Sequence, residues 1–142
     1  MKRIICVLVC AMFAFAALAG MAMGQGATAK QPEEQVKEFI SRWEKLWNED
    51  NPKEMMEMYH PEAKIMYGWG RERGMASKKE YEGILPQRIK ANPSINLTIT
   101  KIDVQGEKAK AAVDMKVRGR VTPSTFELIK ESDKWLIMGF SY

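Results

Sequence analysis

Cysteine is nearly absent from this sequence of 142 residues, and both examples, Cys6 and Cys10, lie among its first ten positions. Histidine is rarer still, with His60 as the single example. A zinc site needs several imidazole or thiolate ligands, so we expect no metal, and no motif in the chain suggests a cofactor. The lack of cysteine after position 10 also excludes a fold held by disulfides.

A strong excess of either charge is missing as well. The chain has 22 basic and 18 acidic residues, a net charge of +4, and this falls to +2 without Lys2 and Arg3. So small an excess gives no reason to expect a nucleic-acid partner.

The longest apolar run, 4–18, is too short for a membrane-spanning helix, which needs about 20 residues. It follows Lys2 and Arg3 and precedes several small residues, which is the pattern of a secretory signal peptide. We therefore predict that residues 1–24 are removed, although cleavage after Ala19 or Ala29 fits as well and an uncleaved anchor is the alternative. The mature protein would be periplasmic or secreted, without a membrane span.

After a flexible leader at 25–32, residues 33–142 are long enough for one domain. Apolar residues from Val36 to Trp47 recur at helical spacing. Asn51 followed by Glu54 starts a second helix, which we expect to run through Tyr59 and to stop at His60-Pro61. A third helix, 77–92, begins with the capping box of Ser77 and Glu80, and Pro86 predicts a kink or break in it.

The other segments predict strands. One short strand, 64–67, is followed by a glycine-rich loop, and four antiparallel strands complete the chain at 95–104, 109–121, 125–131 and 135–142. The turn between the second and third of these four strands is predicted at Thr122-Pro123. The fold class is therefore α+β, with a curved sheet and three helices.

A β-bulge is predicted within the 95–104 strand. Its apolar residues lie at odd positions in the first half, Ile95, Leu97 and Ile99, and mainly at even positions in the second half, Ile102 and Val104. Alternation along a strand cannot put both groups on one face unless an extra residue lies between them. A bulge at Thr100-Lys101 supplies that residue and bends the sheet.

The order of these elements resembles the nuclear-transport-factor-two-like superfamily, in which the sheet curls into a cone around the first helix. The resemblance covers 33–142 and depends on segments such as Trp43-Glu44-Lys45-Leu46-Trp47-Asn48 and Met58-Tyr59-His60-Pro61-Glu62-Ala63. In detail it resembles SnoaL-like domains and the tryptophan-rich C-terminal module of periplasmic L,D-transpeptidase-type proteins. Ketosteroid isomerases of this superfamily use a carboxylate near the end of the first strand, and 65–68 contains no acid. The fold itself hosts many functions.

A cone would bring several aromatic residues together into a ligand pocket, although rings at helical spacing are more often simple core. Arg88 lies on the apolar stripe of the third helix, where its guanidinium either reaches water or contacts an anion at the pocket mouth. The predicted ligand-binding residues are Trp43, Trp47, Tyr59, Tyr67, Trp69 and Arg88.

Two residues are candidates for catalysis. His60 could act as a general base, but its place before Pro61 favours capping of the preceding helix. Glu127 is expected opposite Arg118, as a surface ion pair, with a pocket acid as the alternative.

We therefore expect a non-catalytic module of the cell envelope that binds a small apolar or anionic ligand or a partner protein of the envelope. The alternatives are a small isomerase, dehydratase or hydrolase that uses His60 or Glu127, and a purely structural protein with a filled cone. A homodimer is also expected, because the predicted registers leave an apolar convex face. That face would carry Ile129, Leu136, Met138 and Phe140.

Overall fold

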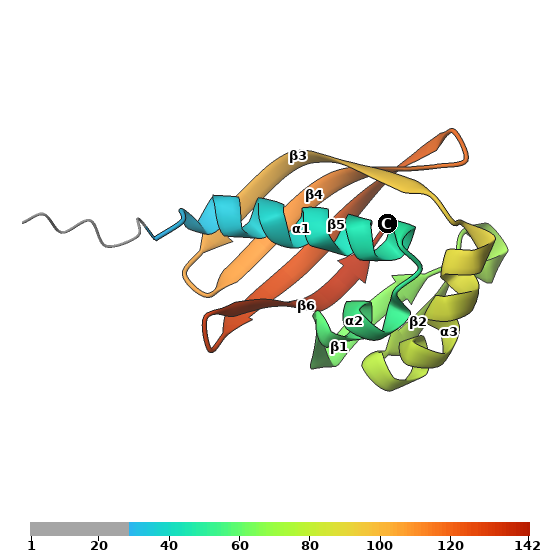
Figure 1. Ribbon diagram of the computed structural model, residues 1–142, viewed down its shortest axis with the longest axis horizontal. Coiled ribbons are helices and arrows are strands. Elements are labelled where there is room, and N and C mark those ends of the chain that lie inside the picture. Colours follow the sequence, from blue (N-terminus) through green and yellow to red (C-terminus); the bar gives the residue numbers. More distant parts are fainter. Residues whose placement is uncertain (1–28) are drawn as a thin grey trace, which may run out of the picture.

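The computed structural model describes residues 29–142, so the predicted signal peptide lies outside the described residues. Within this described part of the chain, three α-helices and a six-stranded sheet form one α+β domain, which confirms the predicted fold class (Figure 1). The helices are α1 (Pro32–Asn48), α2 (Pro52–Glu57) and α3 (Lys78–Ala91), and a single 3-10 turn, η1, spans Gly70–Glu72. No helix within residues 29–142 is long and apolar enough to cross a membrane.

The sheet has the strand order β2-β1-β6-β5-β4-β3, and only β1 and β6 run parallel. The strands are β1 (Tyr59–Tyr67), β2 (Gly74–Ser77), β3 (Ile95–Gln105), β4 (Lys108–Val117), β5 (Arg120–Glu131) and β6 (Lys134–Ser141). In Figure 1, α1 lies across the face formed by β3 to β6, and α3 lies at one end with β1 and β2. The sheet thus curls around α1 as a cone, and the sequence predicted neither β2 nor the full length of β1.

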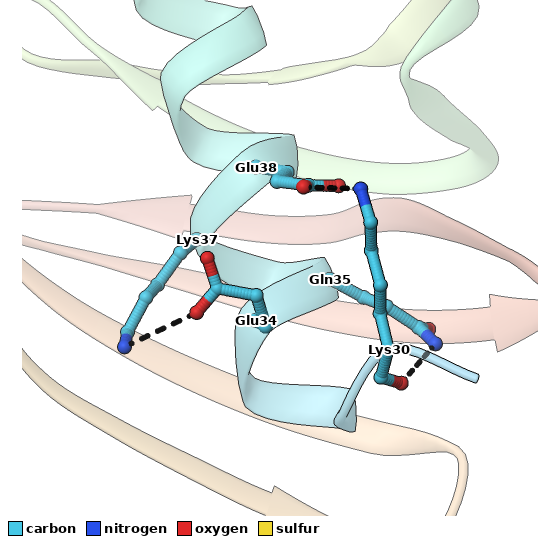
Figure 2. Close-up of polar contacts among 5 residues, drawn as sticks. All are labelled: Lys30, Glu34, Gln35, Lys37 and Glu38. Atoms are coloured by element: carbon cyan, nitrogen blue, oxygen red, sulfur yellow. Dashed lines mark hydrogen bonds and ion pairs between the residues drawn. The ribbon is translucent and has the colours of Figure 1, made fainter. Parts of the chain in front are cut away.

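Helix α1 buries one apolar stripe against the concave face of the sheet, and the buried residues are Val36, Ile40, Trp43, Leu46 and Trp47. Glu33 and Glu34 in the first turn suit the positive end of the helix dipole. Figure 2 shows how the chain enters this helix: the Lys30 ammonium bonds the Glu38 carboxylate, and the Gln35 amide donates to the Lys30 carbonyl.

Both predicted helix caps are present. The Asn51 side chain accepts the Glu54 backbone N–H at 3.2 Å, and Ser77 and Glu80 form a complete capping box. Helix α2 ends at Glu57, however, because Tyr59 already pairs with Ile137 of β6 as part of β1. The predicted extension of α2 through Tyr59 is therefore wrong.

Helix α3 continues through Pro86 without a break. Its buried residues, Tyr81, Leu85 and Ile89, face the open end of the cone, so the tertiary contacts of this face hold the helix together across the missing N–H.

The predicted bulge in β3 is confirmed. Ile99 pairs with Val113, Lys101 pairs with Ala112, and the register shifts between them at Thr100. The Thr100 hydroxyl donates to the Ala112 carbonyl at 3.1 Å, so the extra residue is held by its partner strand.

The predicted turn at Thr122-Pro123 is wrong. The chain turns at Arg118-Gly119, where the φ angles are 50° and 79°, and Val117 pairs directly with Arg120. Glycine adopts this left-handed region readily, so Gly119 was the better turn signal. Pro123 lies within β5, where β6 provides no partner because its pairing with β5 begins at Thr125.

A second register shift lies in β6. Glu127 pairs with Gly139 and Leu128 with Ile137, so Met138 is the extra residue. The shift reverses the parity of the strand after Met138, and Phe140 is buried in the core at 5% exposure. Phe140 therefore does not lie on the convex face, as an unbroken alternation had predicted. Ile129, Leu136 and Met138 are half-buried outside the core, whereas Phe126, Leu128, Trp135 and Ile137 are in the core, as predicted.

Candidate functional site

Two tryptophans of α1 form the floor of the cone. The Trp43 indole N–H donates to the Tyr59 hydroxyl at 3.0 Å, and the Trp47 indole N–H donates to the Asn92 carbonyl at 2.7 Å. The Trp43 ring packs edge-on against Phe126, with centroids 5.2 Å apart, and near-parallel to Phe140 at 5.9 Å. Both indoles thus have structural partners, and rings occupy the middle of the cone.

The space that remains inside the cone is a cavity of about 10 Å³. A single water needs roughly 10–15 Å³ on this measure, so the cavity holds one water at most. Its lining comes from α1, α3, β3, β4, β6 and the β1–β2 loop: Trp43, Trp47, Trp69, Tyr81, Arg88, Asn92, Ile95, Met115, Val117, Phe140 and Tyr142.

Three residues from three different elements close one end of this cavity, which we call the mouth: Trp69, Arg88 and Tyr142. The Arg88 guanidinium carbon lies 5.3 Å from the centroid of the Trp69 ring, in a cation–π contact. The Arg88 Nη2 group donates to the Tyr142 hydroxyl at 3.5 Å, and the Trp69 and Tyr142 rings are 5.7 Å apart. Each residue of the mouth contacts the other two.

Two hydrogen-bond donors of the mouth are buried without an acceptor among residues 29–142, namely the indole Nε1 of Trp69 and the Nε of Arg88. A buried donor without a partner costs roughly 1–3 kcal/mol. Native proteins keep few such groups, and each of them calls for an explanation, such as a bound molecule that supplies the acceptor. The closed mouth therefore presents two N–H groups that an added acceptor would satisfy.

Two phenols that line the cavity, Tyr81 and Tyr142, have a raised pKa. Burial raises the pKa of Tyr81 well above its usual value, and the nearby Arg88 charge opposes this only in part. Burial likewise raises the pKa of Tyr142. Both phenols stay protonated at neutral pH and can serve as hydrogen-bond donors, while Arg88 supplies the positive charge.

Outside the mouth lies an open groove of about 400 Å³. It shares Trp69, Arg88, Asn92 and Val117 with the lining of the inner cavity. The groove is thus adjacent to the cavity, and these four shared residues lie between the two spaces. Its remaining lining residues are Glu72, Ala91, Arg118 and Arg120.

Four of the six residues predicted to bind a ligand line the cavity: Trp43, Trp47, Trp69 and Arg88. Tyr59 is buried beneath Trp43, and Tyr67 packs near Tyr81 with ring centroids 6.5 Å apart, so neither lines it. The structure adds Tyr81, from the buried face of α3, and Tyr142, which directly follows β6. The single register shift in β6, at Met138, is what places Tyr142 on the same side as Phe140.

The two candidates for catalysis lie elsewhere. His60 belongs to β1 rather than to a helix end, and its Nε2 lies 3.1 Å from the Glu131 carboxylate, so the predicted capping role is wrong. Glu127 contacts Lys110 at 3.0 Å instead of Arg118, because the β4–β5 turn differs from the predicted one. It remains a surface ion pair, as expected. Neither residue lines the cavity or the groove beside it.

Among residues 29–142, no group of three or more His, Cys, Asp or Glu side chains is arranged to hold a metal ion. The three residues of the mouth supply aromatic surfaces, a phenol hydroxyl, an indole N–H and one guanidinium group.

Solved structures with the same fold share little sequence with this chain. An NTF2-like protein of unknown function from Shewanella baltica is 17% identical, with a TM-score of 0.62, and the match covers 76% of this chain and 89% of that one. A domain of unknown function with a cystatin-like fold from Nostoc punctiforme is 15% identical, with a TM-score of 0.66 and coverage of 80% and 76%. A third, an NTF2-like protein from Methylobacillus flagellatus, is 19% identical, with a TM-score of 0.64 and coverage of 80% and 92%.

No curated protein matches the chain. A family model does: residues 31–142, which include the entire cone, match the family described as "Putative lumazine-binding". The chain therefore belongs to this lumazine-binding-like family of the NTF2-like superfamily.

Proposed function

We propose that the protein is a non-catalytic binding module for a small planar ring compound, which binds at the mouth between Trp69, Arg88 and Tyr142. The observation that carries this proposal is the pair of buried donors without acceptors, Trp69 Nε1 and Arg88 Nε. A ring that carries carbonyl or imine acceptors, as lumazine does, would satisfy both donors and stack on the aromatic side chains. The family description supports a ligand of this kind.

The small inner cavity requires that Trp69 moves when the ligand enters. At about 10 Å³ the cavity has no room for a ring, whereas the adjoining groove of about 400 Å³ is within the usual range for ligand sites, roughly 300–1,000 Å³. Trp69 lies in the loop between β1 and β2, next to η1, and it separates the two spaces. Displacement of its ring would join them into one site.

A second open groove, of about 530 Å³, lies between α1, α2 and the β5–β6 turn, but its features fit a ligand less well. Its rim carries side chains of both positive and negative charge, and some of them already form ion pairs, such as Arg42 with Glu54 at 3.6 Å. It does contain a third buried donor without an acceptor, Trp135 Nε1, and the Lys130 ammonium lies 5.8 Å from the centroid of that ring. One isolated donor defines a ligand less well than two donors on side chains that contact each other, as Trp69 and Arg88 do.

The enzyme alternative has no comparable support. His60 and Glu127 lie outside the cavity and the adjoining groove, and the described residues that line the inner cavity include neither a carboxylate nor an imidazole. The one carboxylate of the adjoining groove, Glu72, does not line the inner cavity. General acid–base chemistry would need such a group within hydrogen-bond reach of the ligand.

We also propose that the module works in the periplasm or outside the cell. This depends on the signal-peptide pattern of residues 1–24. A partner protein of the cell envelope would be consistent with that location.

The binding proposal is tested by titration of the protein with lumazine and with riboflavin, each a planar ring with carbonyl acceptors. Three of the four tryptophans line the cavity, so binding should quench tryptophan fluorescence, and calorimetry should give the dissociation constant. Arg88→Ala should weaken binding at least tenfold while it leaves the urea midpoint of unfolding nearly unchanged. Trp135→Phe is the control, because Trp135 lies in the other groove.

Failure of both compounds to bind would overturn the proposed function. If Arg88→Ala instead unfolded the domain, Arg88 would be a structural residue. Arg88→Lys would then test the binding role, because it keeps the charge and the packing of the stem but removes the Nε donor.

A further inference from the structure

The groove outside the mouth is lined by three arginines and one acid. Arg88 comes from α3, Arg118 from the β4–β5 turn and Arg120 from the start of β5, and Glu72 is the single carboxylate. Within residues 29–142, none of these four side chains forms an ion pair within 4.0 Å. The groove therefore keeps a charge of about +2 that no other described side chain neutralises.

The fold holds these arginines in place. The tight turn at Arg118-Gly119 pairs Val117 with Arg120, and paired residues of antiparallel strands lie on the same face of the sheet. Val117 is buried at 5% exposure on the concave face, so Arg120 starts from that face as well. Arg118 donates to the carbonyl of Ala91, near the end of α3, and thereby joins the turn to the helix that carries Arg88.

Ordinary structural roles account for only part of this cluster. The bond from Arg118 to Ala91 satisfies a carbonyl at the C-terminus of α3, where a cation is favourable. Arg120 is exposed, and no side-chain hydrogen bond is found for it among the described residues. Like charges brought together at the edge of an apolar cavity repel one another unless an anion lies between them.

We propose that the ring compound bound at the mouth carries a phosphate monoester, which lies in this groove between Arg88, Arg118 and Arg120. The inference rests on the proposed function, and it names the chemical class of the ligand. A phosphate monoester has a charge of about −1.5 to −2 at neutral pH and three strong acceptor oxygens, which matches the charge of the groove and its guanidinium donors. Because the groove adjoins the cavity, a phosphate in the groove would lie next to a ring bound at the mouth.

Riboflavin and flavin mononucleotide differ only by a phosphate and are the probes for this inference. Flavin mononucleotide should bind the protein at least ten times more tightly than riboflavin in low salt, and the ratio should fall as salt is raised. Arg120→Gln should lower the affinity for flavin mononucleotide about fivefold or more and leave that for riboflavin unchanged. Lys116→Gln is the matched control, because it also removes one positive charge. Lys116 belongs to the neighbouring residue pair, Lys116–Val121, and its side chain lies on the opposite face of the sheet.

Each outcome has a separate meaning. Equal affinities of the wild-type protein for the two flavins would overturn the phosphate inference and leave the proposed function intact. Equal losses of flavin mononucleotide affinity in Arg120→Gln and Lys116→Gln would also overturn it, because the effect would then come from net charge alone. Binding of neither flavin, nor of lumazine, would overturn the proposed function itself and this inference with it.

Discussion

The indole N–H of Trp43 donates a hydrogen bond to the hydroxyl of Tyr59 at 3.0 Å, and both residues are only 1% exposed. This contact joins α1 to β1 beneath the cavity. Water cannot replace either partner at this depth, so the hydrogen bond contributes to stability as well as to the shape of the cone floor.

Tyr59→Phe should destabilise the domain by about 1–3 kcal/mol, because it leaves the buried Trp43 N–H without an acceptor. Urea unfolding followed by circular dichroism measures the change. Tyr67→Phe is the control: Tyr67 is half-buried, and no hydrogen bond of its hydroxyl is found within residues 29–142. The control should change the stability by less than about 0.5 kcal/mol, and equal effects of the two substitutions would contradict the role of the hydrogen bond.

Stability should fall at alkaline pH. Burial raises the pKa of Tyr59 and of Tyr81 above the value of about 10 expected in the unfolded chain. Below pH 10 both states hold these protons, whereas above it the unfolded state releases them and the folded state does not. The unfolded state is therefore favoured, by about 1.4 kcal/mol per pH unit for each tyrosine, until the pH reaches the folded pKa.

Urea midpoints between pH 9 and pH 11.5 test this dependence. The wild type should lose stability as the pH rises from about 10 to 11.5, and Tyr59→Phe should reduce this slope by the contribution of one tyrosine. An unchanged slope in the variant would show that Tyr59 does not withhold its proton from solvent.

The alternation of apolar residues predicted a register shift well where several apolar residues lie on each side of it. In β3 the switch from Ile99 to Ile102 identified the bulge and the whole register with β4. In β6 a similar register shift lies between Ile137 and Phe140. Gly139 indicates an irregular strand there. The prediction of an unbroken strand therefore put Phe140 on the wrong face of the sheet.

The site was less predictable than the fold because it depends on contacts between distant segments. Trp69 and Arg88 could be singled out from their unusual surroundings in the sequence. Tyr142 could not, because its position follows from the register shift in β6. Arg120 became part of the groove only through the turn at Arg118-Gly119, since the turn predicted at Thr122-Pro123 would pair it with Thr125.

The loop that carries Trp69 should depend on Gly68. Its φ is +75°, and a Cβ at this position would lie 2.1 Å from the backbone oxygen of Glu72. Gly70 is a matched control, because its φ is +59° and a Cβ there would meet nothing within 4 Å. Gly70→Ala should cost about 1–2 kcal/mol for the left-handed conformation alone.

Gly68→Ala should cost more than this, because the loop must also move away from its own backbone. It should shift the fluorescence of Trp69 and weaken ring binding, whereas Gly70→Ala should leave both properties close to wild type. Identical ring affinities in the two variants would show that the loop geometry does not position Trp69.

Export predicts a mature protein that begins between Gly20 and Lys30, with Gln25 as the favoured first residue. N-terminal sequencing of the protein isolated from its native source decides the matter. An intact Met1-Lys2-Arg3 terminus in the membrane fraction would favour the alternative of an uncleaved anchor.

The convex face of the sheet remains the place where we expect a homodimer. Ile129 pairs with Leu136 on this face, next to Met138, and all three are half-buried although no described helix covers them. Met66 pairs with Met75 on the same side of β1 and β2, and Met75 is 58% exposed. A two-fold contact between copies would cover these five apolar side chains.

Light scattering at micromolar concentration should give twice the mass of the chain. Met138→Lys should convert the dimer to a monomer, because dimerisation would bury an unpaired ammonium group in an apolar contact. Val121→Lys is the matched control: Val121 is also apolar, is 54% exposed, and pairs with Lys116 near the β4–β5 turn, away from the five residues. A monomer mass for the wild type would contradict the dimer. Dissociation by Val121→Lys but not by Met138→Lys would place the contact at the turn instead.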